Sequence, residues 1–392
     1  MTKNLYNPKI AVLVAVFGLF SCDDDEKANL RPSIDYAQLT AATPYSQLFV
    51  DANGTTTVDL SEGNDRFKMF QSLNYYSTSA VTAKTHIDAT KLKNMFSNSG
   101  GAFTDINNAT PPIVVVGAEL NASNVQLRNV VASSRPSTEA EAIRAKIESY
   151  FDDIDAASNS VSQTASIGVA GRLDDKFLVD ERGIEIAQVI QKSLIGALQV
   201  DYICNVLLSE GLTAENYKTV GDNNYTELEH NWDEAYGLLT LNQIYQEGAT
   251  ATTKNSSEFG IGSYMWEYNR NNFAKIHPAF LKGRAAIVNN DRDELNTQAT
   301  FIRTEFEIAL ANAALGYLEK WKTGATDGAR AHSIAEGLGF IYSLRFATTH
   351  QADAAFSDAI LDDLIGSANG FWDLDVAKIT AASDAIKAKF NL

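Results

Sequence analysis

The chain has 392 residues, of which 45% are hydrophobic, so it is long enough and apolar enough to bury a substantial core. Lysine and arginine total 32 against 49 aspartate and glutamate, and the formal net charge is −17. This acidity argues against nucleic acid as a partner, because affinity for the phosphate backbone depends on basic side chains. It identifies no particular ligand, since a negative surface also keeps an exported protein soluble.

The N-terminus has the pattern of a bacterial lipoprotein signal peptide. Two lysines precede an apolar run over residues 10–20. This run is shorter than the roughly 20 residues that a membrane-spanning helix needs, and it fits a segment that the export machinery reads. The run ends in LFSC at residues 19–22, which is similar to a lipobox, although Phe20 is bulkier than usual there. We expect removal of residues 1–21 and lipidation of Cys22; an unlipidated secreted protein is the alternative.

A lipid on Cys22 would make the membrane a partner and place the protein in the cell envelope, anchored to the outer membrane. The acidic run at residues 23–26 resembles the signal that sends Bacteroidetes lipoproteins to the cell surface, but it also fits a plain solvated tether, so the periplasmic and surface faces stay open. Loss of the signal leaves 30 basic against 49 acidic residues. Residues 22–45 read as a flexible tether and residues 46–392 as the folded domain.

The cysteine content limits the covalent chemistry of the folded domain. Besides Cys22 the chain contains only Cys204, within an apolar stretch at residues 202–207. A single thiol cannot form an internal disulfide or a cysteine metal knuckle. We interpret Cys204 as a buried small hydrophobic residue.

The first half of the domain contains one hairpin signal and several helices. Within residues 48–60, Asn53-Gly54 stands between two short segments that contain apolar residues, which predicts a small β-hairpin. Apolar spacing then predicts a helix from a cap at Asn64 or Asp65 to Tyr76, and a capping box of Thr138 and Glu141 predicts another that continues to Phe151. Residues 86–131 are mixed, with a helical piece at 92–96 and a buried run at 113–116, and residues 158–180 read as a loop.

The second half contains mostly helices. A long helix that is apolar almost all round is expected over residues 181–209. Further helices are expected at about residues 232–246, 265–274, 294–321, 329–346, 356–364 and 376–390. A polar segment at 247–262 is the best boundary between halves. The fold class is therefore all-α: a helical bundle with a small N-terminal β-hairpin, divisible into sub-bundles at about 60–246 and 263–392 that a duplication could have produced.

Two segments share a local pattern that could carry chemistry. His230 is followed four residues later by Glu234, and His332 is followed four residues later by Glu336; each segment has glycine at its seventh place. Positions four apart lie on one face of a helix, so each imidazole can lie beside its carboxylate as a pair of metal ligands. If the two segments face one another, the pairs converge in the core as in carboxylate-rich metal sites of helical bundles.

A structural interpretation of the same pattern stays open. Histidine and glutamate at this spacing also form plain hydrogen bonds or ion pairs, and a duplicated helical hairpin would repeat them without any ligand. The recurrence of Glu-Ile-Ala at residues 185–187 and 307–309 gives modest support to a duplication. The glycines cost helix stability, about 1 kcal/mol each, which predicts that another helix approaches closely there.

Other candidate groups are weaker. His86, His277 and His350 lack a partner pattern and read as structural or exposed, and His277 precedes Pro278 at an expected helix end. The stripe formed by Glu185, Gln188, Lys192 and Gln199 could line a polar site or satisfy itself. The sequence has no zinc-protease helix, no nucleophile elbow, no phosphate-binding loop and no dinucleotide fingerprint.

Three stretches together resemble the DUF4856 family of uncharacterised Bacteroidetes lipoproteins. They are residues 230–237, Gly283-Arg284 with Asn290-Asp291, and residues 331–343, and the similarity extends over nearly the whole mature chain. This family has no established activity. The chain also looks more distantly like imelysin-type proteins, which are associated with iron uptake and in one branch with peptidase activity. Their Gly-x-His-x-x-Glu motif is absent, because Asp233 and Ala335 stand three residues after the histidines.

Three functions are compatible with the sequence. The leading hypothesis is a non-enzymatic protein that binds a divalent metal or iron through His230, Glu234, His332 and Glu336. The second is a metal-assisted peptidase or other hydrolase with Glu234 or Glu336 as the general base. The third is an accessory lipoprotein that captures glycan or peptide beside an outer-membrane transporter, for which Tyr264, Trp266 and Tyr268 are the candidate aromatic platforms, although a place in the core would also suit them.

Overall fold

Helices dominate the computed structural model of the protein, which describes residues 30–109, 112–243, 250 and 259–392. The expected signal peptide, Cys22 and the first part of the tether, up to residue 29, lie outside the described residues, as does most of the predicted boundary at 247–262. None of the described helices is both long enough and apolar enough to cross a membrane. The all-α class predicted from the sequence is confirmed.

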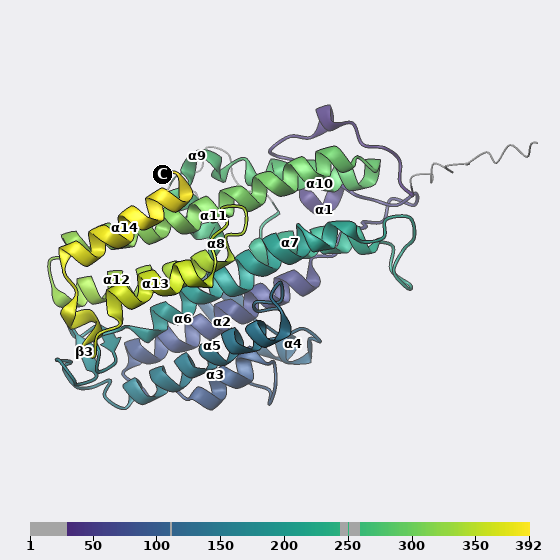
Figure 1. The fold of residues 1–392 in the computed structure, drawn as a ribbon. Coiled ribbons are helices and arrows are strands. Elements are labelled where there is room, and N and C mark those ends of the chain that lie inside the picture. The colour runs from purple at the N-terminus through teal and green to yellow at the C-terminus, as the bar shows by residue number, and fades with distance from the viewer. Residues whose placement is uncertain (1–29, 110–111, 244–249, 251–258) are drawn as a thin grey trace, which may run out of the picture.

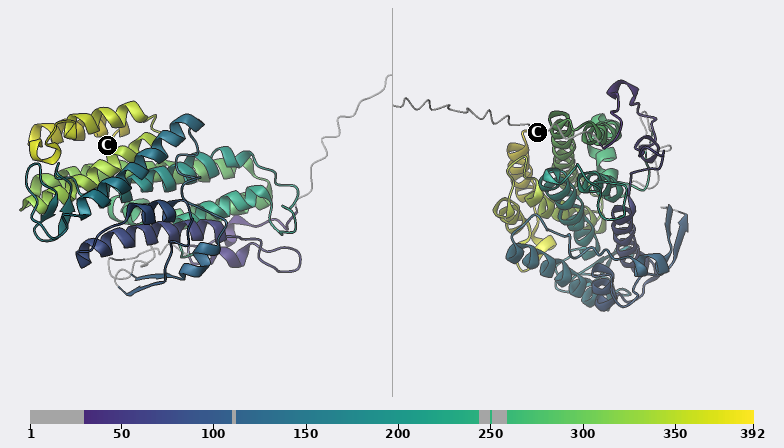
Figure 2. Two further views of the ribbon diagram at one scale, coloured as in Figure 1. Left: turned by 90° about the horizontal axis from the view of Figure 1, so that it is seen from below. Right: turned by 90° about the vertical axis from the view of Figure 1, so that its right-hand side faces the viewer.

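The helices lie side by side as a bundle, seen end-on in the right-hand view of Figure 2. In Figure 1, α14 lies toward one edge of the bundle and α3 toward the opposite edge, with α6 and α2 between them. The α-helices are α1 (Tyr45–Leu48), α2 (Ser61–Ala83), α3 (Ala89–Phe96), α4 (Gly117–Ala122), α5 (Ser137–Ser158), α6 (Ile186–Leu194), α7 (Glu227–Leu239), α8 (Ile261–Tyr268), α9 (Arg270–Phe273), α10 (Ile276–Asn289), α11 (Arg292–Thr323), α12 (Asp327–Ser343), α13 (Ala354–Ile365) and α14 (Val376–Phe390).

The packing partners of the central helices fix where the site residues lie. Helix α7 packs against α2 and α10, and α12 packs against α6, α11 and α13. One main hydrophobic core contains buried residues from Tyr45 to Phe390 and so includes both predicted sub-bundles. The division into sub-bundles, and the duplication behind it, stay predictions.

The β-structure is smaller than expected at the N-terminus and larger elsewhere. At Asn53-Gly54 the chain turns as predicted, but the two sides share only the antiparallel bridge between Val50 and Thr56. The two-stranded hairpins are formed by β1 (Ile106–Ala109) with β2 (Pro112–Val115) and by β3 (Gly171–Leu173) with β4 (Phe177–Val179). The run at 113–116 is therefore mostly a strand: Ile113 and Val115 are buried, whereas Val114 and Val116 are exposed. Likewise, the expected loop at 158–180 contains β3 and β4.

Two predicted helix caps are wrong. Helix α2 begins at Ser61, ahead of Asn64 and Asp65, and α5 begins after Pro136 without a side-chain cap, so Thr138 lies inside its first turn. The capping box that the structure contains opens α7, where the Thr226 hydroxyl accepts from the Glu229 N–H and the Glu229 carboxylate accepts from the Thr226 N–H. Each side chain accepts from the backbone N–H of the other residue, which satisfies two donors that the first turn would otherwise leave unpaired.

The expected helix over residues 181–209 is divided. Helix α6 occupies Ile186–Leu194, and a π-helical segment, η2, follows over Ile195–Leu207. Because nearly every side of this segment is buried, its apolar pattern has no polar face from which the helical period could be read. The sequence therefore predicted a helix here but not its wider winding.

Helix α10 was not expected, because His277-Pro278 reads as the end of a helix. In the structure these residues lie in its first turn. Proline is tolerated there, since the N–H that it lacks would have no partner within the helix. The correction matters because α10 brings Arg284 against α7, as described below.

The glycines at the seventh place of the two His/Glu segments, Gly237 and Gly339, both lie close to another helix. A Cβ on Gly237 would lie 2.7 Å from the carbonyl oxygen of Leu60 and 3.3 Å from the Cα of Gly63, so α7 approaches the start of α2 backbone to backbone. A Cβ on Gly339 would lie 2.5 Å from the Lys192 Cβ and 3.0 Å from the carbonyl oxygen of Val189, so α12 also approaches α6 closely. The close helix approach predicted for both glycines is therefore confirmed. Gly337, which directly follows Glu336, differs from them, because a Cβ there would meet only the Tyr317 Cβ at 3.5 Å, an ordinary contact.

This difference predicts opposite effects of alanine. Gly237→Ala should lower the free energy of unfolding by about 1–3 kcal/mol, because the backbone of α2 must move to accept the methyl group. Gly337→Ala should be neutral or stabilising by up to about 1 kcal/mol, because alanine favours a helix interior. Urea unfolding of the two variants measures both effects, and equal destabilisation would contradict the packing described here.

Candidate metal centre

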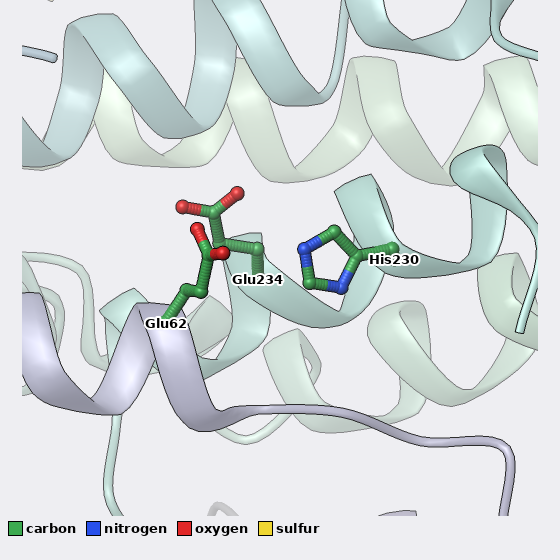
Figure 3. A group of neighbouring side chains, drawn as sticks. All are labelled: Glu62, His230 and Glu234. Carbon is green, nitrogen blue, oxygen red and sulfur yellow. The ribbon is translucent and has the colours of Figure 1, made fainter. Parts of the chain in front are cut away.

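The close approach of α2 and α7 brings three possible metal ligands together. Glu62 lies in the first turn of α2, and His230 and Glu234 lie one turn apart on α7. One ligand atom from each residue lies within 4.8 Å of the other two, and Figure 3 shows a ring nitrogen of His230 turned toward both carboxylates. Glu62 is exposed, His230 is half-buried and Glu234 is buried, so the group lies where the core meets solvent.

Arg66 already neutralises the two carboxylates of this group. Its guanidinium Nη1 lies 3.2 Å from Glu62 Oε2 and forms a close ion pair with Glu234 Oε1. The Arg66 side chain is 5% exposed, so its charge depends on these partners. A metal ion at this place would have to displace the guanidinium from at least one carboxylate.

Glu234 is shielded from water, and its second carboxylate oxygen accepts a hydrogen bond. Burial raises the pKa of Glu234, and this effect outweighs the opposing attraction of Arg66. The Tyr202 hydroxyl donates to Glu234 Oε2 over 3.2 Å. Burial also raises the pKa of Tyr202, so the tyrosine stays a neutral donor. These contacts orient Glu234 in the way that hydrogen bonds to a ligating carboxylate orient a metal ligand.

His230 is positioned by stacking. Its ring lies over Tyr225 with centroids 4.8 Å apart and planes 13° apart. Its Nδ1 is buried and has no hydrogen-bond partner among the described residues. A buried ring nitrogen without a partner is uncommon in proteins.

The second His/Glu pair lies in a different network. His332 Nδ1 lies 2.6 Å from Glu185 Oε2, and its Nε2 lies 3.8 Å from Glu336 Oε2. Glu336 in turn pairs with the buried Lys192 ammonium at 2.9 Å. Burial opposes ionisation of Glu336, but Lys192 and His332 outweigh it and lower the pKa of Glu336. A fixed ammonium on Glu336 makes this pair a structural ion network.

The four ligands predicted from the sequence are therefore not gathered into one group. Among the described residues, the group whose ligand atoms lie close enough together to hold one metal ion consists of Glu62, His230 and Glu234. It contains neither His332 nor Glu336. The polar stripe on α6 and η2 is satisfied partly within itself and partly by other elements. Lys192 donates to Gln188 Oε1 over 2.8 Å, whereas Glu185 pairs with His332 and Gln199 bonds to the backbone of Leu238 and Ile261.

The remaining histidines have structural partners or lie at the surface. His277 is fully buried, with Nδ1 at 2.8 Å from the Tyr236 hydroxyl and Nε2 at 2.9 Å from the Thr43 carbonyl oxygen, and burial lowers its pKa to about 4. His350 Nδ1 lies 2.7 Å from Glu307. His86 is 52% exposed. The aromatic platforms proposed at Tyr264 and Trp266 are buried, as their place in the core requires.

Glu62 and Arg66 are the site residues that the sequence analysis missed. Their spacing of four residues on α2 was visible as a helical ion pair, but such pairs are common on helix surfaces. Nothing local connects them to α7, since Arg66 and Glu234 are 168 residues apart in the chain. The contact exists only because Gly63 and Gly237 let the two helices approach.

Two carboxylates and an imidazole form a donor set that suits zinc, manganese or ferrous iron. Ligand atoms around a tetrahedral zinc ion lie about 3.3 Å apart, as bonds of about 2.0 Å imply. The 4.8 Å limit of the present group means that its side chains need to close by about 1.5 Å at most. Exposed Glu62, on one edge of the group, is the side chain with room to move. Three protein ligands would leave a further position for water.

The comparison with protein families identifies one match. Residues 45–392 match the family described as domain of unknown function DUF4856, which covers nearly all of the predicted folded domain. No curated protein and no solved structure matches the chain.

The network around His332 predicts a measurable pH dependence. Burial lowers the pKa of His332, but the hydrogen bond to Glu185 and the charges of Glu185 and Glu336 outweigh it and raise the pKa. The folded protein thus holds this proton more tightly than the unfolded chain, so the stabilisation is complete below the unfolded pKa of about 6.5 and is lost as pH rises through the folded value. The stability difference between wild type and His332→Gln should therefore shrink between pH 6 and pH 9 in urea unfolding. His86→Gln is the control for loss of an exposed histidine, and a difference that grows with pH would contradict the assignment.

Proposed function

The chain belongs to the DUF4856 family, and we propose that it is a cell-envelope lipoprotein whose helical body binds a divalent metal ion through Glu62, His230 and Glu234. The single observation that carries the proposal is the convergence of three ligand side chains from two helices, with a ring nitrogen of the histidine turned toward both carboxylates. The net charge of −17 adds a general attraction for cations.

Binding at this site would be an exchange of one cation for another. Arg66 neutralises Glu62 and Glu234 in the metal-free protein, which explains how two carboxylates stay close together without a metal ion. An arriving ion would also gain the imidazole nitrogen of His230 as a ligand, which the ion pairs of Arg66 with Glu62 and Glu234 do not use. Exposed Glu62 gives the ion a route from solvent.

Two parts of the proposal, the lipid anchor on Cys22 and the preference for iron, are supported by the sequence alone. The LFSC sequence at residues 19–22 supports lipidation of Cys22 and attachment to the outer membrane, and an outer-membrane transporter is a partner that such a position would allow. The resemblance to imelysin-type proteins favours iron among the possible metals. Either zinc or manganese would also suit the donor set.

The alternative functions have less support. A metal-assisted hydrolase needs a carboxylate free to act as base, yet Glu234 is paired with Arg66 and Glu336 with Lys192. A glycan- or peptide-capturing role relied on exposed aromatic platforms, and Tyr264 and Trp266 are 8% and 6% exposed. The binding role is therefore the one that the geometry favours.

The metal site predicts stoichiometric binding that depends on one histidine. The protein spanning residues 23–392 should bind one Zn²⁺, Mn²⁺ or Fe²⁺ ion per chain in isothermal titration calorimetry. His230→Ala should weaken binding more than about tenfold, because it removes a ligand worth at least 1.4 kcal/mol. His332→Ala is the matched control, as it removes the equivalent histidine of the other segment. Equal binding by wild type and His230→Ala, or no binding by wild type, would contradict the site.

Arg66 offers an independent test of the exchange. Arg66→Gln should destabilise the metal-free protein by about 3 kcal/mol, because it leaves the buried Glu234 without its counter-ion. The same variant should bind metal more tightly than wild type, and the added ion should restore much of the lost stability. Thermal unfolding with and without the ion measures both effects. A destabilised variant that metal does not restore would argue that Arg66 and Glu234 form only a structural ion pair.

The anchor is tested separately from the metal site. Cys22→Ala in the full chain should abolish labelling by a palmitate analogue and move the protein from the membrane fraction to the soluble fraction of expressing cells. Cys204→Ala is the control, because that thiol is buried within η2. Unchanged labelling of Cys22→Ala would exclude lipidation at this position.

A further inference from the structure

A cavity of about 600 Å³ lies between α5, α6, α12 and α13 and is lined by other residues than those of the candidate metal centre. None of its lining residues is Glu62, His230 or Glu234. Its volume falls within the range of roughly 300–1,000 Å³ that is typical of sites for small organic molecules. The cavity therefore has the size of a binding site that the metal proposal does not use.

The floor of the cavity is apolar and belongs to the core. Ile184 lies just before α6, Ile186 and Val189 lie in its first turns, and Leu338 and Tyr342 come from one face of α12. All five side chains are buried against the protein while contributing to the cavity wall. A ligand that covered this floor would remove apolar surface from water, which favours binding.

The mouth of the cavity carries charged groups, some of which are already engaged. The Arg182 guanidinium donates to the carbonyl oxygens of Ile365 and Ser367, so it holds the end of α13 in place. Asp358 pairs with Arg345 at 2.6 Å. The Arg182 donors and the Asp358 carboxylate are engaged in these contacts, although the carbonyl oxygens leave the charge of Arg182 unneutralised.

The carboxylates that remain outnumber the cations. The side chains of Asp153 and Asp362 form no hydrogen bond or ion pair with the described part of the chain, although both line the cavity. The remaining cation of the lining is the ammonium of Lys146, which is exposed and lies over the ring of Tyr150 at 4.6 Å. The mouth thus carries unneutralised negative charge beside an aromatic ring that already attracts an ammonium group.

Asp180 is the carboxylate that the backbone fixes in place. Its Oδ1 accepts from the N–H groups of Arg182 over 2.9 Å and Ile184 over 2.8 Å. Both bonds reach the same oxygen, which leaves Oδ2 without a hydrogen-bond partner among the described residues. Burial raises the pKa of Asp180 to about 6, a cost that a nearby cation would offset.

We propose that this cavity binds an organic amine, whose apolar body covers the isoleucine, valine and leucine floor and whose ammonium group meets Asp153 and Asp180 at the mouth. The apolar floor excludes a bare metal ion as the natural occupant, because a metal ion gains nothing from aliphatic side chains. The excess of carboxylates disfavours an anionic molecule of the same shape. This inference goes beyond the proposed metal-binding function and does not depend on it.

A matched series of three probes tests the charge requirement. The protein spanning residues 23–392 is titrated with 4-phenylbutylamine, 4-phenylbutanol and 4-phenylbutyrate at pH 7.5, with binding followed by ligand-observed NMR and calorimetry. The amine should bind about tenfold more tightly than the alcohol, and the carboxylate should bind most weakly. An amine that binds no better than the alcohol, or a series in which none of the three binds, overturns the proposal.

Three variants locate the binding. Asp153→Asn should weaken amine binding about fivefold and leave alcohol binding unchanged. Asp152→Asn, which removes the neighbouring carboxylate that pairs with Lys93 at 2.6 Å, is the control and should change neither. Leu361→Trp, which adds a bulky ring at the cavity wall, should weaken the amine and the alcohol together. Circular dichroism confirms that each variant is folded. Amine binding that survives Leu361→Trp in a folded protein would place the amine elsewhere and overturn the assignment.

Discussion

The buried guanidinium of Arg284 is the interaction around which the site half of the bundle is arranged. Its side chain is fully buried, and it contacts Glu229 at 2.8 Å, Asp233 at 3.0 Å and the Thr57 hydroxyl at 3.0 Å. It therefore ties α10 to α7 and to the segment that leads into α2. Removing one partner from a buried ion group typically costs about 3–5 kcal/mol, so neither helix can rotate or slide without a large penalty. Burial raises the pKa of Asp233 to about 6 even beside this arginine, which shows how far water is excluded.

This constraint decides what the neighbouring face of α7 presents. Glu229 and Asp233 point into the ion group, and His230 and Glu234, one position further along the helix, face α2 instead. The same helix thus devotes one stripe to its own anchorage and the adjacent stripe to the candidate ligands. Asp233, which stands where the imelysin motif would have a glutamate, belongs to the anchoring stripe. The pair Gly283-Arg284 serves the same contact, since a Cβ on Gly283 would collide with the indole of Trp232 and the arginine forms the ion group.

The sequence was informative where structure is local and uninformative where it depends on distant contacts. Apolar periodicity predicted α11 and α14 within a few residues, because one face of each helix meets the core. It could not predict α10, because proline is common both just after the end of a helix and in the first turn of one. Of the candidate site, the pair on α7 was visible as a spacing of four, whereas Glu62 reaches it from another helix. The partner of His332 is likewise remote, since Glu185 lies 147 residues away in the chain.

Because Arg66 already pairs with both carboxylates, a cation must bind strongly enough to displace it before it can occupy the proposed site. A cation that enters must first compensate for a broken ion pair with buried Glu234, so only the surplus of its own binding energy appears as affinity. Magnesium and calcium, which prefer several oxygen ligands and gain little from an imidazole, start at a disadvantage in this competition. Ions that bind nitrogen well start with an advantage. At the proposed site, the internal arginine would in this way select against hard cations such as magnesium and calcium and in favour of transition metals.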